Sequence, residues 1–190
     1  GDDILSSPVV VDGSVFVGSN DGNLYAVDAE SGEQQWSFET SDWVRSSPTV
    51  VNGTVFVGSL DNALYAVDAE SGEQQWQFET SDGITSSPTV VDETVFIGSL
   101  DSRFYAVDLN TGNLQWSFDT GDLISSSPTV ADGTVFFGSA DKHLYAVDTE
   151  TGTEKWNFET EDWINSSPTI VNESVFVGSS DGHLYAIDVN

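Results

Sequence analysis

The sequence contains no cysteine and no methionine, and only four of its 190 residues are lysine or arginine. The absence of cysteine excludes disulfides, thiolate metal sites and a cysteine nucleophile. No apolar run is long enough for a membrane-spanning helix or for the core of a signal peptide. We therefore expect a mature or excised domain that is not inserted in a membrane.

Acidic residues are abundant: there are 32 of them, and the net charge is -28. This charge repels nucleic acids and anionic membranes, so neither is an expected partner. Molar salt shortens the range of repulsion between surface carboxylates to about 3 Å. The acidic, lysine-poor composition resembles that of proteins from extreme halophiles, and the alternative is an acidic surface on a mesophilic protein.

The charge leads to a prediction about salt. If the acidic surface is an adaptation to high salt, removing molar salt will unscreen the carboxylates and lower the unfolding temperature. Thermal unfolding at several NaCl concentrations measures this effect. An unfolding temperature that does not change with ionic strength would contradict the halophilic origin.

A repeat of 40 residues runs through the chain without insertions. It places Ser-Ser-Pro at five positions and tryptophan at four, namely Pro8, Pro48, Pro88, Pro128 and Pro168, and Trp36, Trp76, Trp116 and Trp156. The units are residues 1–40, 41–80, 81–120 and 121–160, followed by a partial unit, 161–190. A regular period of this length is the signature of a repeat architecture.

Each unit contains short apolar runs separated by turn residues. In the second unit the first three runs are 47–51, 54–58 and 64–68, and the fourth is 76–80. Val, Phe, Tyr and Trp favour strands, and Asn52-Gly53 is a strong hairpin signal. The sequence therefore predicts an all-β protein: a single β-propeller domain, 1–190, built of four-stranded antiparallel blades.

The partial unit leaves the fifth blade without its outer strand. We expect five blades that close into a ring; the alternative is an open piece of a longer array. The strand 184–187 then has a free edge, which is a template for pairing with another chain. A homo-oligomer through this edge is a possible partnership.

The motif Ala-x-Asp-x-x-Ser/Thr-Gly-x-x-x-Trp occurs four times. Its copies are Ala26, Asp28, Ser31, Gly32 and Trp36; Ala66, Asp68, Ser71, Gly72 and Trp76; Ala106, Asp108, Thr111, Gly112 and Trp116; and Ala146, Asp148, Thr151, Gly152 and Trp156. It resembles the repeat of quinoprotein-type propellers, which include the pyrroloquinoline-quinone (PQQ) dehydrogenases and an outer-membrane assembly lipoprotein. The resemblance implies that the tryptophans dock one blade on the next and that Asp28, Asp68, Asp108 and Asp148 pin a turn.

The same resemblance bears on cofactors. The dehydrogenases of that family carry cofactor-binding insertions, calcium ligands and, in several, an adjacent cysteine pair. This chain has neither insertions nor cysteines, so we expect no cofactor, neither PQQ nor Ca²⁺.

One loop face of the predicted disc differs from blade to blade. It is formed by the links between blades and by the second hairpin of each blade. Because exposed Trp and Arg often anchor interfaces, we predict that this face binds a ligand or partner. Its candidate residues are Trp43, Arg45, Arg103, Lys142, His143, Trp163, Asn165 and His183. The alternative is drift in solvent-exposed loops, with the two tryptophans packed between blades.

Two rings of aspartates on that face have two interpretations. One ring is Asp2, Asp42, Asp82, Asp122 and Asp162, and the other is Asp21, Asp61, Asp101, Asp141 and Asp181. The second ring is a weak candidate for a metal site. Asp also accepts backbone hydrogen bonds in tight turns, and we favour that role because the spacing of a calcium loop is absent.

No catalytic constellation is present, because a periodic chain provides equal positions rather than unlike groups that converge. We expect a non-catalytic module for protein or small-ligand binding, or a scaffold. The alternatives are a PQQ-dependent dehydrogenase or a fragment of one, and a recently amplified or engineered repeat without an evolved ligand. Three glycosylation sequons, at Asn52, Asn165 and Asn172, slightly favour an extracellular or cell-surface location.

Overall fold

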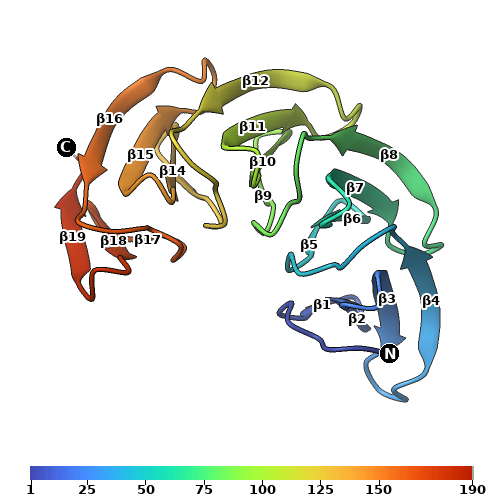
Figure 1. Ribbon diagram of the computed structural model, residues 1–190. Helices are drawn as coiled ribbons and strands as arrows, with labels where there is room; N and C mark the ends of the chain where they lie inside the picture. The colour runs from blue at the N-terminus through green and yellow to red at the C-terminus, as the bar shows by residue number, and fades with distance from the viewer. Residues whose placement is uncertain (190) are drawn as a thin grey trace.

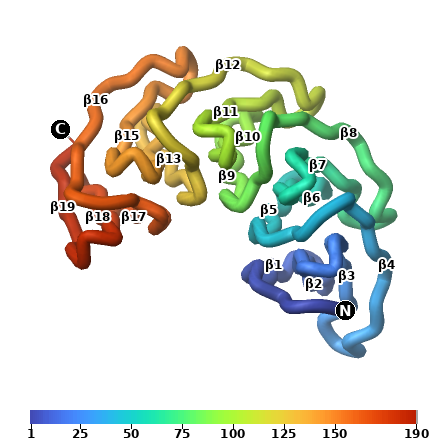
Figure 2. Tube along the Cα trace, in the orientation of Figure 1, coloured from blue at the N-terminus to red at the C-terminus, as the bar shows by residue number. Residues whose placement is uncertain are grey.

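The computed structural model describes residues 1–189. It contains 19 strands in five antiparallel sheets and, within these residues, no helix, hence none that could span a membrane. The sheets follow one another around an arc, each with its first strand on the inner side and its last on the outer side (Figures 1 and 2). The prediction of an all-β propeller of antiparallel blades is confirmed.

The five sheets, called blades one to five, are listed here with their strands. Blade one has β1 (Val9–Val11), β2 (Ser14–Gly18), β3 (Asn23–Asp28) and β4 (Gln34–Glu39). Blade two has β5 (Thr49–Val51), β6 (Thr54–Gly58), β7 (Ala63–Asp68) and β8 (Gln74–Glu79). Blade three has β9 (Thr89–Val91), β10 (Thr94–Gly98), β11 (Arg103–Asp108) and β12 (Leu114–Asp119). Blade four has β13 (Thr129–Ala131), β14 (Thr134–Gly138), β15 (His143–Asp148) and β16 (Glu154–Glu159), and blade five has β17 (Thr169–Val171), β18 (Ser174–Gly178) and β19 (Leu184–Asp188).

The first hairpin of each blade is closed by a two-residue turn. In blade two this turn is Asn52-Gly53, with φ angles of 52° and 75°. Positive φ at both residues is typical of the type I′ turn, whose twist matches that of the flanking strands. The turn places Val51 opposite Thr54 and Val50 opposite Val55, which sets the register of the blade.

Neighbouring blades share a hydrophobic core. Each of the four interfaces joins Phe, Leu or Ala side chains of one blade to Val, Ile and Tyr side chains of the next. The blades approach closely where Gly58, at the end of β6, faces Ile84: an added Cβ at this glycine would lie 3.3 Å from the Ile84 carbonyl oxygen and even closer to its side chain. Ile84 is fully buried. Close packing at this point sets how each blade turns relative to its neighbour.

The periodic tryptophans link each outer strand to the next blade. Trp36 Nε1 donates a hydrogen bond to the Ala69 carbonyl (3.1 Å), and Trp76 and Trp116 make the same bond to Leu109 and Thr149. Gly72 lies against the Trp36 ring, where a Cβ would be only 2.8 Å from Cδ2. Trp156 packs against the core shared by blades four and five.

The motif aspartates cap the turn between the third and fourth strands. Asp148 Oδ1 accepts hydrogen bonds from the Thr151 hydroxyl (2.9 Å) and from the backbone N–H of Thr151 (3.0 Å), and Lys155 lies 3.2 Å from Oδ2. These contacts, those of Thr151 first, lower the pKa of Asp148 to about 2. Asp28, Asp68 and Asp108 accept the equivalent bonds.

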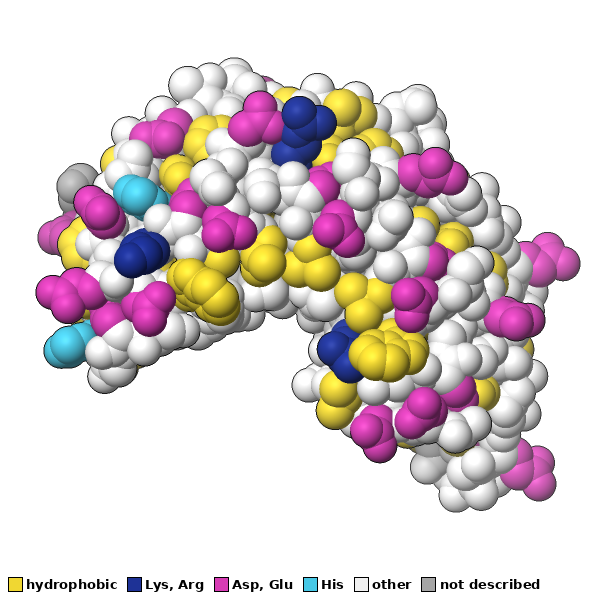
Figure 3. Space-filling model, in the orientation of Figure 1, with side chains coloured by type: hydrophobic (Ala, Val, Ile, Leu, Met, Phe, Trp, Pro, Cys, Tyr) yellow, Lys and Arg dark blue, Asp and Glu magenta, His cyan; other side chains and the backbone are white. Residues whose placement is uncertain are grey.

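The five blades do not close into a ring, so the expectation of closure is wrong for this chain. Blades one and five stand apart across an open gap (Figures 1 and 3). Ile4 is 58% exposed, whereas its counterparts Val44, Ile84, Ile124 and Ile164 are fully buried. The rotation between blades follows from side-chain packing at each interface, and four such steps do not bring blade five back to blade one.

Candidate functional site

The links between blades lie beside the second hairpin turns. The Ser41 N–H donates to Asp61 Oδ2 (2.8 Å), and the Leu60 N–H donates to the Trp43 carbonyl (2.9 Å). We call this surface the link face. It consists of the links 41–46, 81–86, 121–126 and 161–166 together with the turns 19–22, 59–62, 99–102, 139–142 and 179–182. The structure thus places the two predicted elements side by side.

Trp43 and Arg45 form the most distinctive pair on the link face. The Arg45 guanidinium carbon lies 4.2 Å from the centroid of the Trp43 ring, and Arg45 Nε donates to Asn20 Oδ1 (3.2 Å). Trp43 is 41% exposed. Stacking on the cation and the bond to Asn20 restrict the motion of Arg45, so the ring and the guanidinium form a preformed contact surface.

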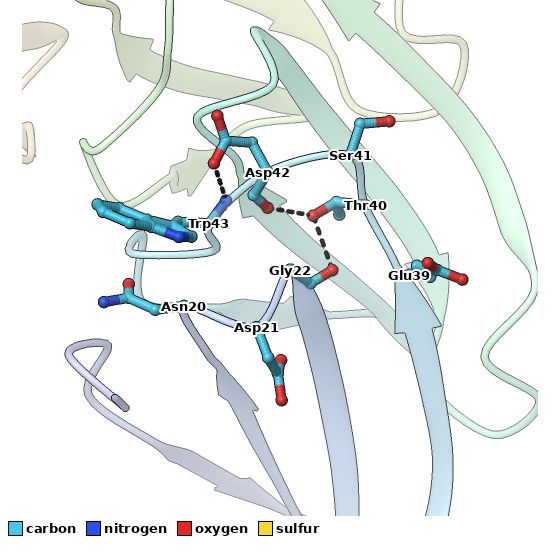
Figure 4. A pocket seen from close by; sticks show the side chains of 8 residues that line it. All are labelled: Asn20, Asp21, Gly22, Glu39, Thr40, Ser41, Asp42 and Trp43. Carbon is cyan, nitrogen blue, oxygen red and sulfur yellow. Dashed lines mark hydrogen bonds between the residues drawn. The ribbon is translucent and has the colours of Figure 1, made fainter. Parts of the chain in front are cut away.

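A polar groove of about 540 Å³ adjoins Trp43 (Figure 4). Its lining residues are Asn20, Asp21, Gly22, Glu39, Thr40, Ser41, Asp42 and Trp43. The Thr40 hydroxyl lies 2.6 Å from the Asp42 carbonyl and 2.9 Å from the Gly22 carbonyl, which fixes the link against the turn of blade one. Figure 4 shows Trp43 and Glu39 on opposite sides of the groove. The groove therefore combines one aromatic wall with carboxylate acceptors.

The remaining candidate residues lie on the other blades. Arg103 pairs with Asp119 on its own blade, and Lys142 Nζ donates to the Glu161 carbonyl (3.1 Å). His143 and His183 each contact the aspartate two residues earlier. Trp163 is 50% exposed, and Asn165 accepts a bond from the Ser125 hydroxyl.

Of the eight candidates, the structure brings only Trp43 and Arg45 into mutual contact among residues 1–189. The candidates are distributed over blades two to five, which follow one another around the arc. The sequence analysis missed Asn20 and Glu39. Glu39 has an acidic counterpart in each complete unit and gives no signal, but Asn20 stands where the other units have Leu, Ala or Ser, and this difference could have indicated it. Their role depends on Arg45 and on the shape of the groove.

The second ring of aspartates is engaged in hydrogen bonds within the turns. Asp61 Oδ2 accepts bonds from the Tyr65 hydroxyl (2.9 Å) and from Ser41 N–H, and Oδ1 accepts one from Ala63 N–H. The Tyr hydroxyl bond recurs in every blade. No group of three or more His, Asp or Glu that could hold a metal ion occurs in residues 1–189. This geometry favours the turn role, and the Asp-x-x-x-Tyr spacing is the sequence signal that could have indicated it.

The first ring makes a shorter-range contact. Asp42 Oδ1 accepts a hydrogen bond from the Trp43 N–H (2.7 Å), and Asp2, Asp82, Asp122 and Asp162 each accept the same bond from the N–H of the following residue.

Asp21, in the second ring, has an additional partner: the N-terminal ammonium lies 2.9 Å from its Oδ2. Burial works against ionisation there, but the hydrogen bonds from the N-terminus, Tyr25 and Asn23 outweigh it and hold the pKa of Asp21 well below its usual range.

Several solved structures share this arrangement of strands. BamB from Moraxella catarrhalis is 21% identical with a TM-score of 0.85; the match covers 98% of this chain and 58% of that one. The quinohemoprotein alcohol dehydrogenase from Comamonas testosteroni is 19% identical with a TM-score of 0.86, covering 100% of this chain and 42% of that one. The computationally designed protein Ika8 is 17% identical with a TM-score of 0.86, covering 95% and 57%. The chain thus spans less than two thirds of each of these proteins.

These likenesses concern the fold, and they confirm the resemblance to the quinoprotein-type propeller. No curated protein matches the chain significantly. The model of one protein family, described as the beta-propeller of the beta-alanine-activating enzyme, matches residues 1–190. Because that match extends over the whole sequence, the chain belongs to this family of β-propellers.

Proposed function

We propose that the chain is a non-catalytic binding module that recognises a protein partner through Trp43 and the groove beside it. The observation that supports this most is the exposed Trp43 ring with Arg45 stacked on it at the edge of a groove. Trp and Arg are the residue types most enriched among those that dominate binding energy at protein interfaces. The other half-exposed tryptophan on this face, Trp163, has Asn165 where Trp43 has Arg45.

The groove indicates the chemistry of the partner. Glu39 and Asp42 line the groove with carboxylates, whereas the third carboxylate, that of Asp21, is already paired with the N-terminal ammonium. The net charge of the chain is -28. A complementary segment would insert an apolar or aromatic side chain against Trp43 and donate hydrogen bonds from neutral or basic groups. An extracellular or cell-surface location, favoured by the sequons, remains a prediction.

The engagement of the turn carboxylates supports a role without catalysis. Both carboxylate oxygens of Asp61 accept hydrogen bonds, from the Tyr65 hydroxyl and from the backbone N–H groups of Ser41 and Ala63. The tyrosine bond recurs in the other blades. Equal groups of this kind stabilise turns, whereas catalysis needs unlike groups at one place. A chromophore that remains bound after PQQ and Ca²⁺ are added, together with reduction of a dye, would contradict this proposal and support the dehydrogenase alternative.

Peptides selected from a displayed random library against the intact protein test the site. Replacing Trp43 by alanine is expected to weaken the selected binders on the order of 10- to 30-fold, because a central aromatic anchor contributes about 2 kcal/mol. The measurement is the dissociation constant of each peptide by fluorescence anisotropy in molar salt.

Trp163→Ala is the matched control, because Trp163 occupies the same repeat position and is 50% exposed. It is expected to leave the selected binders within about twofold of the unmodified protein, since rim contacts contribute little. Equal binding by Trp43→Ala and the unmodified protein would contradict the proposal. A library that yields no binder would favour an amplified or engineered repeat without a ligand.

A further inference from the structure

The loop face opposite the link face contains another groove, between blades one and two. This face is formed by the first and third hairpin turns, which are joined in blade two by a hydrogen bond from the Ala69 N–H to the Gly53 carbonyl (2.9 Å). The groove has a volume of about 590 Å³. Val11, Phe16 and Val50 supply its apolar lining. Two complete blades therefore build it.

Three carboxylates line the same groove, those of Asp12, Asp68 and Glu70. Asp68 Oδ1 accepts the turn bond from the Ser71 N–H (2.8 Å). The carboxylates of Asp12 and Glu70 are exposed and have no hydrogen-bond or ion-pair partner in residues 1–189. No lysine, arginine or histidine occurs among the described residues that line the groove. Apolar surface beside uncompensated negative charge favours a ligand that carries a cation on an apolar stem.

An equivalent groove, of about 580 Å³, lies between blades three and four and already contains a cation. Lys155 Nζ donates hydrogen bonds to the Gly133 carbonyl (2.8 Å) and to the Thr134 hydroxyl (2.8 Å), and it lies 3.2 Å from Asp148 Oδ2. These three partners have counterparts in blade two, namely Gly53, Thr54 and Asp68. The chain itself thus shows that a groove of this kind accommodates a primary ammonium.

In blade two the position of Lys155 is occupied by Gln75. The Gln75 Oε1 accepts a hydrogen bond from the Thr54 hydroxyl (3.0 Å), and the same side chain also bonds Asp68. Because the amide is neutral, it leaves the charge of the three carboxylates uncompensated. The groove between blades one and two therefore lacks the internal cation that its counterpart has.

The small side chain of Ala69 leaves space in the groove. Ala69 is half-buried and belongs to the lining. Its counterpart at the interface of blades two and three, Leu109, is 8% exposed and packs with Phe56 in the core that those blades share. Phe56 is in turn the counterpart of Phe16. A leucine at this repeat position therefore fills space that an alanine leaves open.

We propose that the groove between blades one and two binds the side chain of a lysine that belongs to another polypeptide. The ammonium lies among the three carboxylates, and the methylene stem packs on Val11 and Val50. An exposed ion pair contributes little by itself, so the stem and the several acceptors act together. This site lies on the loop face opposite Trp43 and does not depend on the function proposed there.

The probe is a lysine residue blocked at both ends, Nα-acetyl-lysine methylamide. It is titrated into nitrogen-15-labelled protein in molar salt, and the chemical shifts of the Gly53 and Glu70 backbone N–H groups report binding. We expect saturable shifts with a dissociation constant on the order of 1–10 mM. The control compound is the norleucine equivalent, which differs only by lacking the ammonium. It is expected to bind at least tenfold more weakly.

One pair of variants tests the charge. Gln75→Lys supplies the groove with its own ammonium, as Lys155 does in blade four, and is expected to weaken binding of the probe at least tenfold. Gln77→Lys adds the same charge to the same strand at an exposed residue that does not line the groove. It is expected to leave the affinity within about twofold of the unmodified protein, which separates an effect at the groove from a general change in net charge.

A second pair tests the space. Ala69→Leu is expected to abolish the shifts, and folding should tolerate it because Leu109 stands at the same repeat position. Thr149→Leu makes the corresponding change in the groove between blades three and four and is expected to leave binding unchanged. Trp43→Ala is also expected to leave it unchanged, so a failure of this proposal and a failure of the function proposed for the link face are distinguishable.

Two results would overturn the proposal. One is equal binding of the lysine and norleucine compounds, or equal binding of the lysine compound to Gln75→Lys and to the unmodified protein, because the groove would then not recognise the ammonium. The other is saturable binding of the free diamine cadaverine at this groove without binding of the blocked lysine, because the occupant would then be a small diamine and not a side chain of a polypeptide.

Discussion

Replacing Gly98 by alanine is expected to destabilise the protein by about 1–3 kcal/mol, the usual range for overpacking a core. Gly98 ends β10 and faces Ile124 of the next blade. An added Cβ would lie 2.8 Å from Ile124 Cβ and 3.2 Å from its carbonyl oxygen. Because the backbone and a fully buried side chain are both in the way, relief requires the two blades to move apart. Urea unfolding in molar salt measures the change.

Gly178→Ala is the matched control for this prediction. Gly178 ends β18 at the same repeat position, and the nearest atom to an added Cβ is Ser166 Oγ, at an ordinary 3.5 Å. Neither glycine has a positive φ, so neither substitution forces an unfavourable backbone. Gly178→Ala is expected to be neutral or to stabilise by up to about 1 kcal/mol, because alanine restricts the unfolded chain. Equal losses in the two variants would mean that contact between blades is not the cause.

The strands were predictable because their determinants are local. The turn at Asn52-Gly53 and the strands on either side of it, 49–51 and 54–58, span ten residues. The apolar runs recur in all five units, and Asn or Asp followed by Gly recurs in three of them. The four tryptophans at intervals of 40 residues likewise indicated which strand lies outermost. Patterns of this kind are set by backbone preference and by the alternation of side chains.

The open arc was not predictable, because the rotation between blades depends on contacts between units. Gly58 and Ile84 lie 26 positions apart, and their approach to within contact distance depends on atomic packing that periodicity does not encode. A small change in that packing, repeated at each interface, decides whether a ring closes. The expectation of a closed ring treated the number of units as the number of blades in a full turn.

The site was predictable in part. Links and second hairpins were assigned to one face because strand order alone determines on which side each loop emerges. The pairing of Trp43 with Arg45, and of Arg45 with Asn20, depends on rotamers and on the neighbouring turn. The periodic aspartates are conspicuous in the sequence and therefore looked like a candidate metal site. In the structure, Asp61 and its counterparts accept hydrogen bonds from tyrosine hydroxyls and stabilise the turns.

Those tyrosines predict that the protein unfolds steeply in alkali. Burial, followed by the hydrogen bond to an aspartate, raises the pKa of Tyr65, Tyr105 and Tyr145 well above the usual value near 10. The three phenols stay protonated in the folded state while they ionise in the unfolded chain. Their contribution to stability is thus complete below pH 10 and is lost as the pH rises from there towards the folded-state pKa.

The expected slope follows from proton linkage. Each phenol that is protonated only in the folded state lowers the free energy of unfolding by about 1.4 kcal/mol per pH unit, so the three together lower it by about 4. Against a domain stability of about 5–15 kcal/mol, a loss at this rate is large enough to unfold the chain in strong alkali. The chain has only two lysines, Lys142 and Lys155, so the tyrosines dominate this titration.

Tryptophan fluorescence and tyrosinate absorbance, recorded together against pH in molar salt, test the prediction. Both signals are expected to change in one transition, because ionisation of the three buried phenols requires unfolding. Tyr105→Phe removes one of the three groups and is expected to reduce the slope by about 1.4 kcal/mol per pH unit, whatever it does to stability at neutral pH. If tyrosinate from all five tyrosines formed near pH 10 with fluorescence unchanged, the phenols would be titrating in the folded protein. The bonds between Asp61, Asp101 and Asp141 and their tyrosines would then not hold the turns as the structure indicates.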